Sequence, residues 1–390
     1  MSEYNLIDLK FTGRKMKKWY KVWNLFLAYL DLLLRREKPH ADPVELSVGT
    51  TSFCNLRCIQ CPREGHEGNL MPFDEHLDLA YYQSLEPYLK RAKEVSLYGL
   101  GEPMIDKRYF DKVRYVTSFG AEVSLSSNGT LMDERRCREI IESGIKSIGI
   151  SLDAAREETF AVVRPPGGLP AIVENIKRLS RMKKEQETLR PLIRLSFGIM
   201  PQNLEDLPLF PDLAAEAGGE EIIVHSVIFM SEAKRRELTT DPQKVRPAIE
   251  AARARARELG IAFCVWDLDP FTYLKSLRYV RGESEASYAS SSATGRSSHG
   301  YFCFFLWRNA MIQGHGELFP CCYMTNKRLG RLQNGNLLEL RGHPFLAELR
   351  RRLYEGDPPE PCAGCPQLYP YDRQNILKSG LQEMINLIRS

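Results

Sequence analysis

The sequence predicts an α/β protein: a mainly parallel sheet wrapped by helices, with one helix before it and a cysteine-rich segment after it. Three features lead to this prediction. Short apolar segments alternate with segments of helical spacing between residues 44 and 230, a longer apolar segment of helical spacing precedes them, and five of the ten cysteines follow residue 300. Strands that alternate with helices are typical of right-handed βα units, whose strands lie parallel.

The composition is that of an ordinary globular protein. Of the 390 residues, 43% are hydrophobic and 27% are charged, which excludes a mostly disordered, a collagen-like or a many-span membrane protein. A formal net charge of +4 is too weak to indicate nucleic-acid binding. The opening MSEYNLIDLK lacks the apolar segment of a secretory signal, so we expect the protein in the cytoplasm, where clustered cysteines bind metals or act as thiols.

Residues 1–43 are expected to form an amphipathic N-terminal helix. The apolar stretch 19–34 contains Lys21, Asn24 and Asp31, so it is too short and too charged to span a bilayer, which needs ~20 apolar residues. Two prolines just after it end the helix. The spacing favours packing on the sheet domain and leaves contact with a membrane surface, or with a second copy, open. The apolar side chains that recur every three or four residues are Trp19, Val22, Trp23, Phe26, Leu27, Leu30, Leu33 and Leu34.

Residues 44–230 are expected to hold the parallel sheet. The six strand candidates are Glu45–Thr50, Glu94–Tyr98, Ala121–Ser126, Ser147–Leu152, Leu192–Gly198 and Glu221–Ile228. The helical segments between them lie near 75–91, 107–118, 132–143, 170–186 and 205–217. We expect both faces of these short, apolar strands to be covered. Functional side chains are then expected at the carboxyl ends of the strands.

Residues 231–300 are expected to be a helical connector with a serine-rich loop. A charged helix is predicted at 245–259 and a short apolar run at 261–266, and the serine-rich stretch after them suits a linker. Residues 301–390 form the last expected domain. Its segment NAMIQGHGELFPCC is typical of a β-hairpin that turns at Gly314-His315-Gly316.

Three cysteines follow the first predicted strand within eight residues. Cys54, Cys58 and Cys61 are separated by three and two residues, a spacing that a loop can wrap around a metal centre. Three thiolates do not complete the four iron sites of a [4Fe–4S] cluster, so one iron stays open for another ligand. A zinc loop is the alternative, with His66 as the nearest fourth ligand.

This cysteine spacing after a first strand resembles the signature of the radical S-adenosylmethionine (SAM) superfamily. The resemblance implies a partial (β/α)6 TIM-like barrel over residues 44–230. It also implies a [4Fe–4S] cluster whose open iron binds SAM and reductive cleavage of SAM to a 5′-deoxyadenosyl radical, which abstracts a hydrogen atom from the substrate. The sequence departs from the family at Gln60, where the usual residue is aromatic and packs by the adenine.

Further segments resemble the superfamily in order along the chain. Gly99-Leu100-Gly101-Glu102-Pro103 is similar to its Gly-Gly-Glu-Pro motif, which the resemblance assigns to the amino group of SAM. The third and fourth strands end in polar segments, and an arginine follows. By resemblance the SAM-binding residues are Gly101, Glu102, Pro103, Asn128, Ser151 (ribose) and Arg164 (methionine carboxylate). Each segment alone also suits a turn, and Asp153 suits a helix cap.

A second cysteine group lies in the last domain. Its pattern is Cys303-x17-Cys321, then Cys362-x2-Cys365 after a long gap, and a four-thiolate zinc site is one interpretation. The surrounding segments resemble the SPASM/twitch extension of radical SAM enzymes, in its form with a single auxiliary [4Fe–4S] cluster. By that resemblance Cys321 rather than Cys322 is the ligand. Cys137 and Cys264 are expected to be ordinary buried cysteines.

These features together predict a radical SAM enzyme of the oxidoreductase type. Peptide-modifying members often carry an N-terminal leader-binding domain longer than the 43 residues here, so we expect a small-molecule substrate: a sugar, an aminocyclitol or a lipid-linked metabolite, oxidised or epimerised. The alternatives are a peptide-modifying maturase, and a non-catalytic iron–sulfur electron-transfer or zinc-binding module. The expected electron donor is a flavodoxin or ferredoxin, no nucleic-acid partner is expected, and the N-terminal helix could bring contact with a membrane surface.

Overall fold

The fold is seen in a computed structural model. It describes residues 3–61, 76–99, 101–227, 237–238, 240–265, 300–313, 316–322, 324, 327–332, 337, 341–359, 362–363, 365 and 368–389, with the side chains of the first helix from residue 18 onward. His66, Leu100, the hairpin turn at 314–315 and the serine-rich stretch lie outside the described residues.

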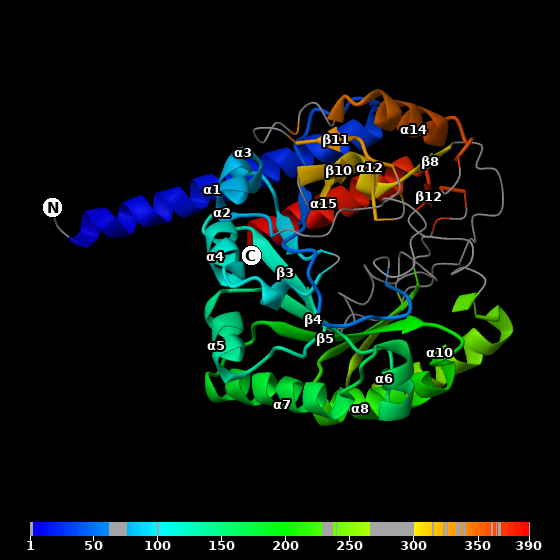
Figure 1. Ribbon diagram of the computed structural model, residues 1–390. Coiled ribbons are helices and arrows are strands. Elements are labelled where there is room, and N and C mark those ends of the chain that lie inside the picture. The colour runs from blue at the N-terminus through cyan, green and yellow to red at the C-terminus, as the bar shows by residue number, and fades with distance from the viewer. Residues whose placement is uncertain are drawn as a thin grey trace.

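A single curved sheet of ten strands forms the centre of the molecule, in the order β11-β10-β9-β1-β2-β3-β4-β5-β6-β7 (Figure 1). Strands β1 to β7 lie parallel in chain order, which confirms the predicted α/β partial barrel. Their bounds are β1 (Glu45–Val48), β2 (Glu94–Leu97), β3 (Glu122–Ser127), β4 (Ser147–Ser151), β5 (Leu192–Ile199), β6 (Glu221–Ser226) and β7 (Ala262–Val265). The apolar run that we placed in the connector contributes β7.

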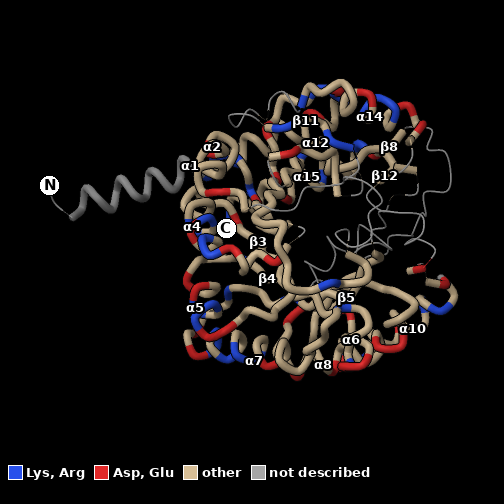
Figure 2. The backbone as a smooth tube through the Cα atoms, viewed as in Figure 1, with Lys and Arg blue, Asp and Glu red and all other residues tan. Residues whose placement is uncertain are grey.

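Helices cover the outer face of this sheet (Figure 1). They are α2 (Leu79–Ser84), α3 (Glu86–Leu89), α4 (Tyr109–Thr117), α5 (Glu134–Glu142), α6 (Glu157–Val163), α7 (Leu169–Glu185), α8 (Phe210–Ala217) and α10 (Pro242–Glu258), with 3-10 turns η1 (Pro103–Ile105) and η2 (Leu204–Leu209). Two predicted helices are each split. Pro87 is the second residue of α3 and Pro211 the second residue of α8, in the first turn, where a missing N–H costs the helix least. Positive and negative residues are interspersed along α5 and α7 (Figure 2).

The cysteine-rich segment extends the barrel sheet and also forms a small two-stranded sheet of its own. The predicted hairpin is present as β9 (Asn309–Gln313) and β10 (Glu317–Phe319), and β9 pairs in parallel with β1. The remaining elements are β8 (Tyr301–Phe302), α12 (Phe304–Arg308), β11 (Gly330–Arg331), α14 (Pro344–Tyr354), β12 (Tyr369–Pro370) and α15 (Arg373–Arg389). Because β9 lies beside β1, the second cysteine group is held next to the start of the barrel.

The N-terminal helix α1 (Glu3–Leu33) packs along α15 (Figure 1). Tyr29 lies against Gly380, and its hydroxyl donates to Glu383 (2.7 Å). Asp31 is fully buried and accepts from the backbone N–H groups of His40 and Ala41, which turns the chain toward β1. Of the described residues, no helix is both long enough and apolar enough to cross a membrane.

Candidate active site

The first three cysteines lie on the loop that leaves the carboxyl end of β1. Backbone hydrogen bonds tie this loop to the end of α6, because Arg57 N donates to Pro165 O (3.0 Å) and Ile59 N donates to Val163 O (3.1 Å). A turn closes its last part, with Cys61 N donating to Cys58 O (3.0 Å). The loop is therefore shaped by neighbours far away in sequence.

Polar side chains reach the sulfur atoms of this loop. Arg164 Nη1 donates to Cys58 Sγ (3.5 Å), and Asn128 Nδ2 lies 3.9 Å from Cys54 Sγ. Burial raises the pKa of Cys58 to about 11, Arg164 acts against the rise, and Cys61 and Cys54 add to it. The three thiols are thus near enough to influence one another. Because the Cys58 thiol is protonated at neutral pH, binding of a metal centre must displace its proton.

Gly101 and Glu102 pack directly against the cysteine loop. Gly101 N donates to Thr51 O (3.2 Å) and Glu102 N donates to Phe53 O (2.7 Å). A Cβ on Gly101 would stand 2.3 Å from Phe53 O, so no other residue fits without moving the backbone. Glycine is therefore required at position 101 because a larger residue would collide with the cysteine loop.

The Glu102 carboxylate connects the ends of β2 and β3. It accepts from Met104 N (3.1 Å), Ser127 Oγ (2.9 Å) and Asn128 N (2.7 Å), and it is buried. Burial raises its pKa, and these hydrogen bonds oppose the rise. A carboxylate offers about four acceptor positions, so one remains for a further donor.

Asp153, two residues after β4, joins several parts of the site. Its carboxylate accepts from Arg164 Nε (2.8 Å), Gln60 Nε2 (2.6 Å) and Gly198 N (2.7 Å). Its φ of +59° lies in the left-handed region that favours glycine. Strained backbone held by several hydrogen bonds is typical of functional sites. Asp153 thus fixes both Gln60 of the cysteine loop and the guanidinium that touches Cys58.

Two further predicted residues lie at strand ends around this loop. Asn128 follows β3, and its side-chain amide donates to Asn55 Oδ1 (2.9 Å) on the loop. Ser151 ends β4 and accepts from Ser196 Oγ (3.3 Å) across the sheet. Pro103 begins η1 directly after Glu102. All the predicted SAM-binding residues therefore lie at the carboxyl ends of β2, β3 and β4, except Arg164, which follows α6.

The second cysteine group is assembled from three separate segments. Cys303 begins α12, Cys321 follows β10, and Cys362 and Cys365 form a turn in which Cys365 N donates to Cys362 O (3.0 Å). Burial raises the pKa of Cys303 strongly, and its neighbours Cys321 and Cys365 raise it further. These three thiols therefore lie close together.

Cys322 lies against a different neighbour. Burial raises the pKa of Tyr98 to about 12, with a further contribution from Cys322. Tyr98 directly follows β2, so Cys322 lies near the carboxyl end of the barrel sheet, and Cys321 lies near Cys303. Cys137 and Cys264 are fully buried, as expected.

Two family models match this chain. The Radical SAM superfamily model matches residues 48–207, and the SPASM model, described as an iron-sulfur cluster-binding domain, matches residues 303–366. Together they span more than half of the chain, and each covers one of the cysteine groups. The chain belongs to the radical SAM superfamily and carries a SPASM domain.

Several curated proteins are similar to this one. It is 26% identical over 191 residues to a tungsten-containing aldehyde ferredoxin oxidoreductase cofactor-modifying protein of Pyrococcus furiosus, covering 49% of this chain and 53% of that protein. It is 24% identical over 238 residues to the Fe-coproporphyrin III synthase of Methanosarcina barkeri, covering 58% and 57%. The chain thus spans little more than half the length of these relatives.

The fold is shared with solved structures of another protein. SuiB of Streptococcus suis, bound to S-adenosylmethionine, superposes with a TM-score of 0.59 at 13% identity, covering 79% of this chain and 68% of SuiB. SuiB bound to its precursor peptide SuiA superposes with a TM-score of 0.52 at 15% identity, covering 83% and 66%.

This radical SAM protein uses a [4Fe–4S] cluster, SAM and an auxiliary cluster in its SPASM domain. The donor types fit these groups, because thiolates are the usual ligands of iron–sulfur clusters: three cysteines that influence one another lie on one loop, and Cys303, Cys321 and Cys365 lie near one another in the SPASM domain. Of the described residues, no three or more His, Cys, Asp or Glu side chains are arranged to hold a single metal ion.

The sequence did not reveal the role of Asp153. We considered it a helix cap, but Asp206 has that role, since it accepts from the backbone N–H groups of Ala155 and Arg156 before α6. Asp153 instead holds Arg164 and Gln60. In the sequence, an aspartate after a strand looks the same whether it caps a helix or binds an arginine. Only the departure from the family at Gln60 indicated that the surroundings of the cysteine loop differ.

Proposed function

We propose that this radical SAM enzyme abstracts a hydrogen atom from an unactivated C–H bond of a small polar molecule, such as a sugar, an aminocyclitol or the polar part of a lipid-linked metabolite. The outcome would be an oxidation or an epimerisation. The observation that supports this proposal is the polar inner face of the barrel sheet.

The two faces of the sheet differ in polarity. On the outer face, Val95, Leu97, Val123 and Leu125 are buried in the core beneath the helices. The residues between them point inward, are polar and are only half-buried. Inward-facing serines and glycines of four adjacent strands include Ser96, Ser124, Ser126, Gly149, Ser151 and Ser196. We expected short, apolar strands with both faces covered, and the inner face of these strands is instead polar and half-buried.

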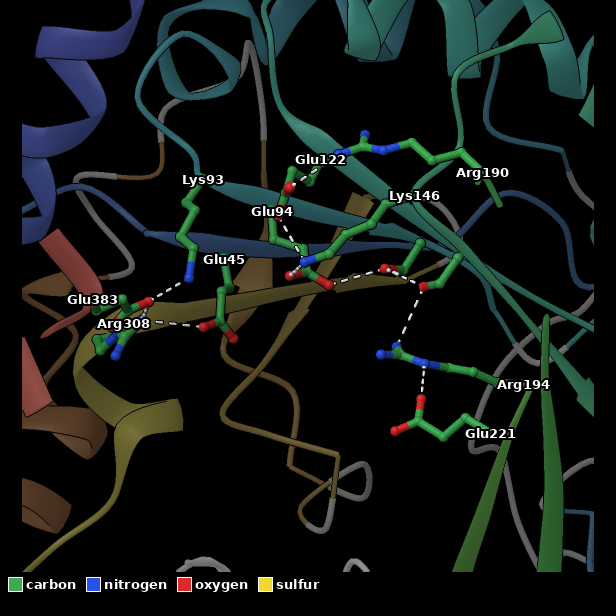
Figure 3. A network of polar contacts seen from close by, with 12 residues as sticks. Glu45, Lys93, Glu94, Glu122, Lys146, Arg190, Arg194, Glu221, Arg308 and Glu383 are labelled. Carbon is green, nitrogen blue, oxygen red and sulfur yellow. Dashed lines mark hydrogen bonds and ion pairs between the residues drawn. The ribbon is translucent and has the colours of Figure 1, made fainter. Parts of the chain in front are cut away.

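Ion pairs close the amino-terminal end of this inner face (Figure 3). Glu45, Glu94 and Glu122 share one register across β1, β2 and β3. Lys146 pairs with Glu122 (2.6 Å) and Glu94 (3.4 Å), and Arg194 pairs with Glu221. Barrel interiors are usually filled by Val, Ile and Leu. A charged end with hydroxyl groups beyond it instead suits a ligand that donates and accepts hydrogen bonds.

The residues of this chain would hold and orient the reacting groups. Cys54, Cys58 and Cys61 would hold the first cluster, and the open iron would leave room for SAM. When bound, cluster and SAM supply the 5′-deoxyadenosyl radical that removes the hydrogen atom. Gly101 lets the SAM-binding segment approach the cysteine loop, and Asp153 keeps the Arg164 guanidinium beside that loop.

The SPASM cysteines would have a different role. Cys303, Cys321, Cys362 and Cys365 would give four thiolates to one auxiliary cluster, so its iron has no position left for a substrate. We infer that this cluster passes electrons or stabilises the domain, with a flavodoxin or ferredoxin as the external electron donor. In an oxidation it would accept the electron that the substrate radical releases.

The proposal can be tested with the full chain, reconstituted and reduced without oxygen. Pools of perdeuterated polar metabolites should raise formation of 5′-deoxyadenosine above the level without substrate, and should leave deuterium in it. Ser126→Val with Ser196→Val should lower this stimulation, whereas the surface variant Val162→Ser should not. Stimulation by peptides alone would instead identify a peptide maturase, and an absence of SAM cleavage would indicate an electron-transfer role.

A further inference from the structure

We propose that the outer face of helices α1 and α15 docks on an anionic lipid surface. This inference concerns a part of the molecule away from the cysteine groups and does not depend on the proposed reaction. It rests on three observations: aromatic side chains exposed on α1, apolar side chains exposed on α15, and the sign of the charges that α15 exposes.

Helix α1 has one buried and one exposed apolar face. Val22, Leu25, Ala28 and Leu32 are buried, so packing on the protein accounts for that side. The opposite side carries four large aromatic residues with high exposed fractions. These are Trp19 (64%), Tyr20 (53%), Trp23 (60%) and Phe26 (40%). Packing within the chain therefore accounts for the buried apolar face of α1 but not for the exposed one.

The exposed aromatic residues form an ordered group. The rings of Trp23 and Phe26 stack with their centroids 5.4 Å apart. Trp19 and Trp23 are one helical turn apart, so they lie on the same side of α1. Tryptophan and tyrosine favour the boundary between lipid headgroups and acyl chains, because their rings are apolar and their N–H or O–H groups are polar.

Helix α15 continues the apolar character beside α1. Its inner side is fixed by Ile376, which is buried, and by Gly380, which contacts Tyr29. Leu377, Leu381 and Ile388 follow at spacings of four and seven, so they share another side of the helix, and each is about half exposed. Two antiparallel helices thus present apolar side chains to solvent.

The charges on these two helices indicate a partner with an anionic surface. Asp31 is fully buried, and Glu383 is bound by Lys93 (2.5 Å) and Arg308 (2.9 Å) on the inner side. The charges that α15 exposes are all basic, namely Arg373, Lys378 and Arg389. The sequence just before Trp19 adds Arg14, Lys15, Lys17 and Lys18. Aromatic residues next to an excess of basic residues complement an anionic headgroup layer.

Vesicle flotation of the full chain tests the proposal. The protein should float with vesicles of phosphatidylcholine and phosphatidylglycerol, float little with phosphatidylcholine alone, and be released by high salt. The variant Trp19→Ser with Trp23→Ser should bind about a hundredfold more weakly, since burial of each indole contributes of the order of a tenfold change. The matched control is Val162→Ser with Leu189→Ser, two exposed apolar residues elsewhere, which should float like the wild type.

A charge variant tests the proposal independently, so that the result does not depend on correct folding of the tryptophan variant. Lys378→Glu with Arg389→Glu changes two exposed side chains, and it should also weaken flotation with anionic vesicles while leaving the circular dichroism spectrum unchanged. Equal flotation of all variants, or no flotation of the wild type, overturns the proposal. A dimer seen by light scattering that only the tryptophan variant dissociates, without vesicle binding, would make a second copy the occupant and likewise overturn it.

Discussion

The two cysteine groups of this protein are built in opposite ways. Cys54, Cys58 and Cys61 lie on one loop, and strand ends β2, β3 and β4 hold that loop from outside through Gly101, Asn128 and Asp153. The SPASM cysteines come from segments up to 62 residues apart, and packing around β9 and α12 brings them together.

The difference indicates where each site can fail. A loop with three donors keeps one iron open, so its neighbours must position both SAM and the loop itself. A site with four donors from distant segments is complete without outside help, but its assembly depends on the fold of the SPASM domain. Mutations can therefore separate SAM cleavage from completed turnover.

The largest expected effect follows from removing the loop thiols. Changing Cys54, Cys58 and Cys61 together to alanine should abolish reductive cleavage of SAM, because no cluster then has an open iron. Cys362→Ala with Cys365→Ala should stop turnover of a substrate but leave uncoupled formation of 5′-deoxyadenosine. Chromatography of that product measures both. Cleavage that disappears equally in both variants would contradict the division of roles.

Gly101→Ala should also disrupt the first site while leaving its cysteines in place. The new Cβ would stand 2.3 Å from Phe53 O and 2.6 Å from Thr51 O, so the cysteine loop or the SAM-binding segment must move. We expect destabilisation of about 2–4 kcal/mol, in the range of core overpacking with backbone shifts, and weakened SAM binding. Gly342→Ala is the matched control, since its Cβ would meet nothing within 4 Å. Equal thermal stability and SAM affinity in the two variants would show that the loop adapts.

Adjacent cysteines sharpen the comparison at the second site. Cys321→Ala should lower the iron content of reconstituted protein from about eight to about four per chain, because Cys321 lies beside Cys303. Cys322→Ala should retain about eight iron atoms per chain, since Cys322 lies near Tyr98. Iron analysis and absorbance near 400 nm measure the result. The reverse outcome would assign the ligand to Cys322.

The sequence predicted the first site far better than the surroundings of the second. Spacing within one loop predicts three ligands, and six strands follow from local apolar patterns. The pairing of β9 with β1 depends on contacts between residues more than 260 positions apart, which no local pattern carries. The polar inner face could have been predicted from the sequence, because Glu94, Ser96 and Tyr98 alternate with Val95 and Leu97. Apolar runs alone do not distinguish it from a strand with two apolar faces.

The smallest expected effect concerns Arg164, which touches the first site without being a cluster ligand. If its guanidinium binds the carboxylate of SAM, Arg164→Ala should weaken SAM binding by about 1.5–3 kcal/mol, the range for hydrogen bonds to charged groups, and leave iron content unchanged. Arg164 also holds Asp153 and Cys58, so Asp153→Asn provides the comparison: it keeps an acceptor for Arg164 but removes the charge. A calorimetric titration in which only Arg164→Ala loses affinity supports direct contact with SAM. Equal losses in both variants would show that Arg164 acts by holding the cysteine loop, and unchanged affinity in both would remove it from the SAM site.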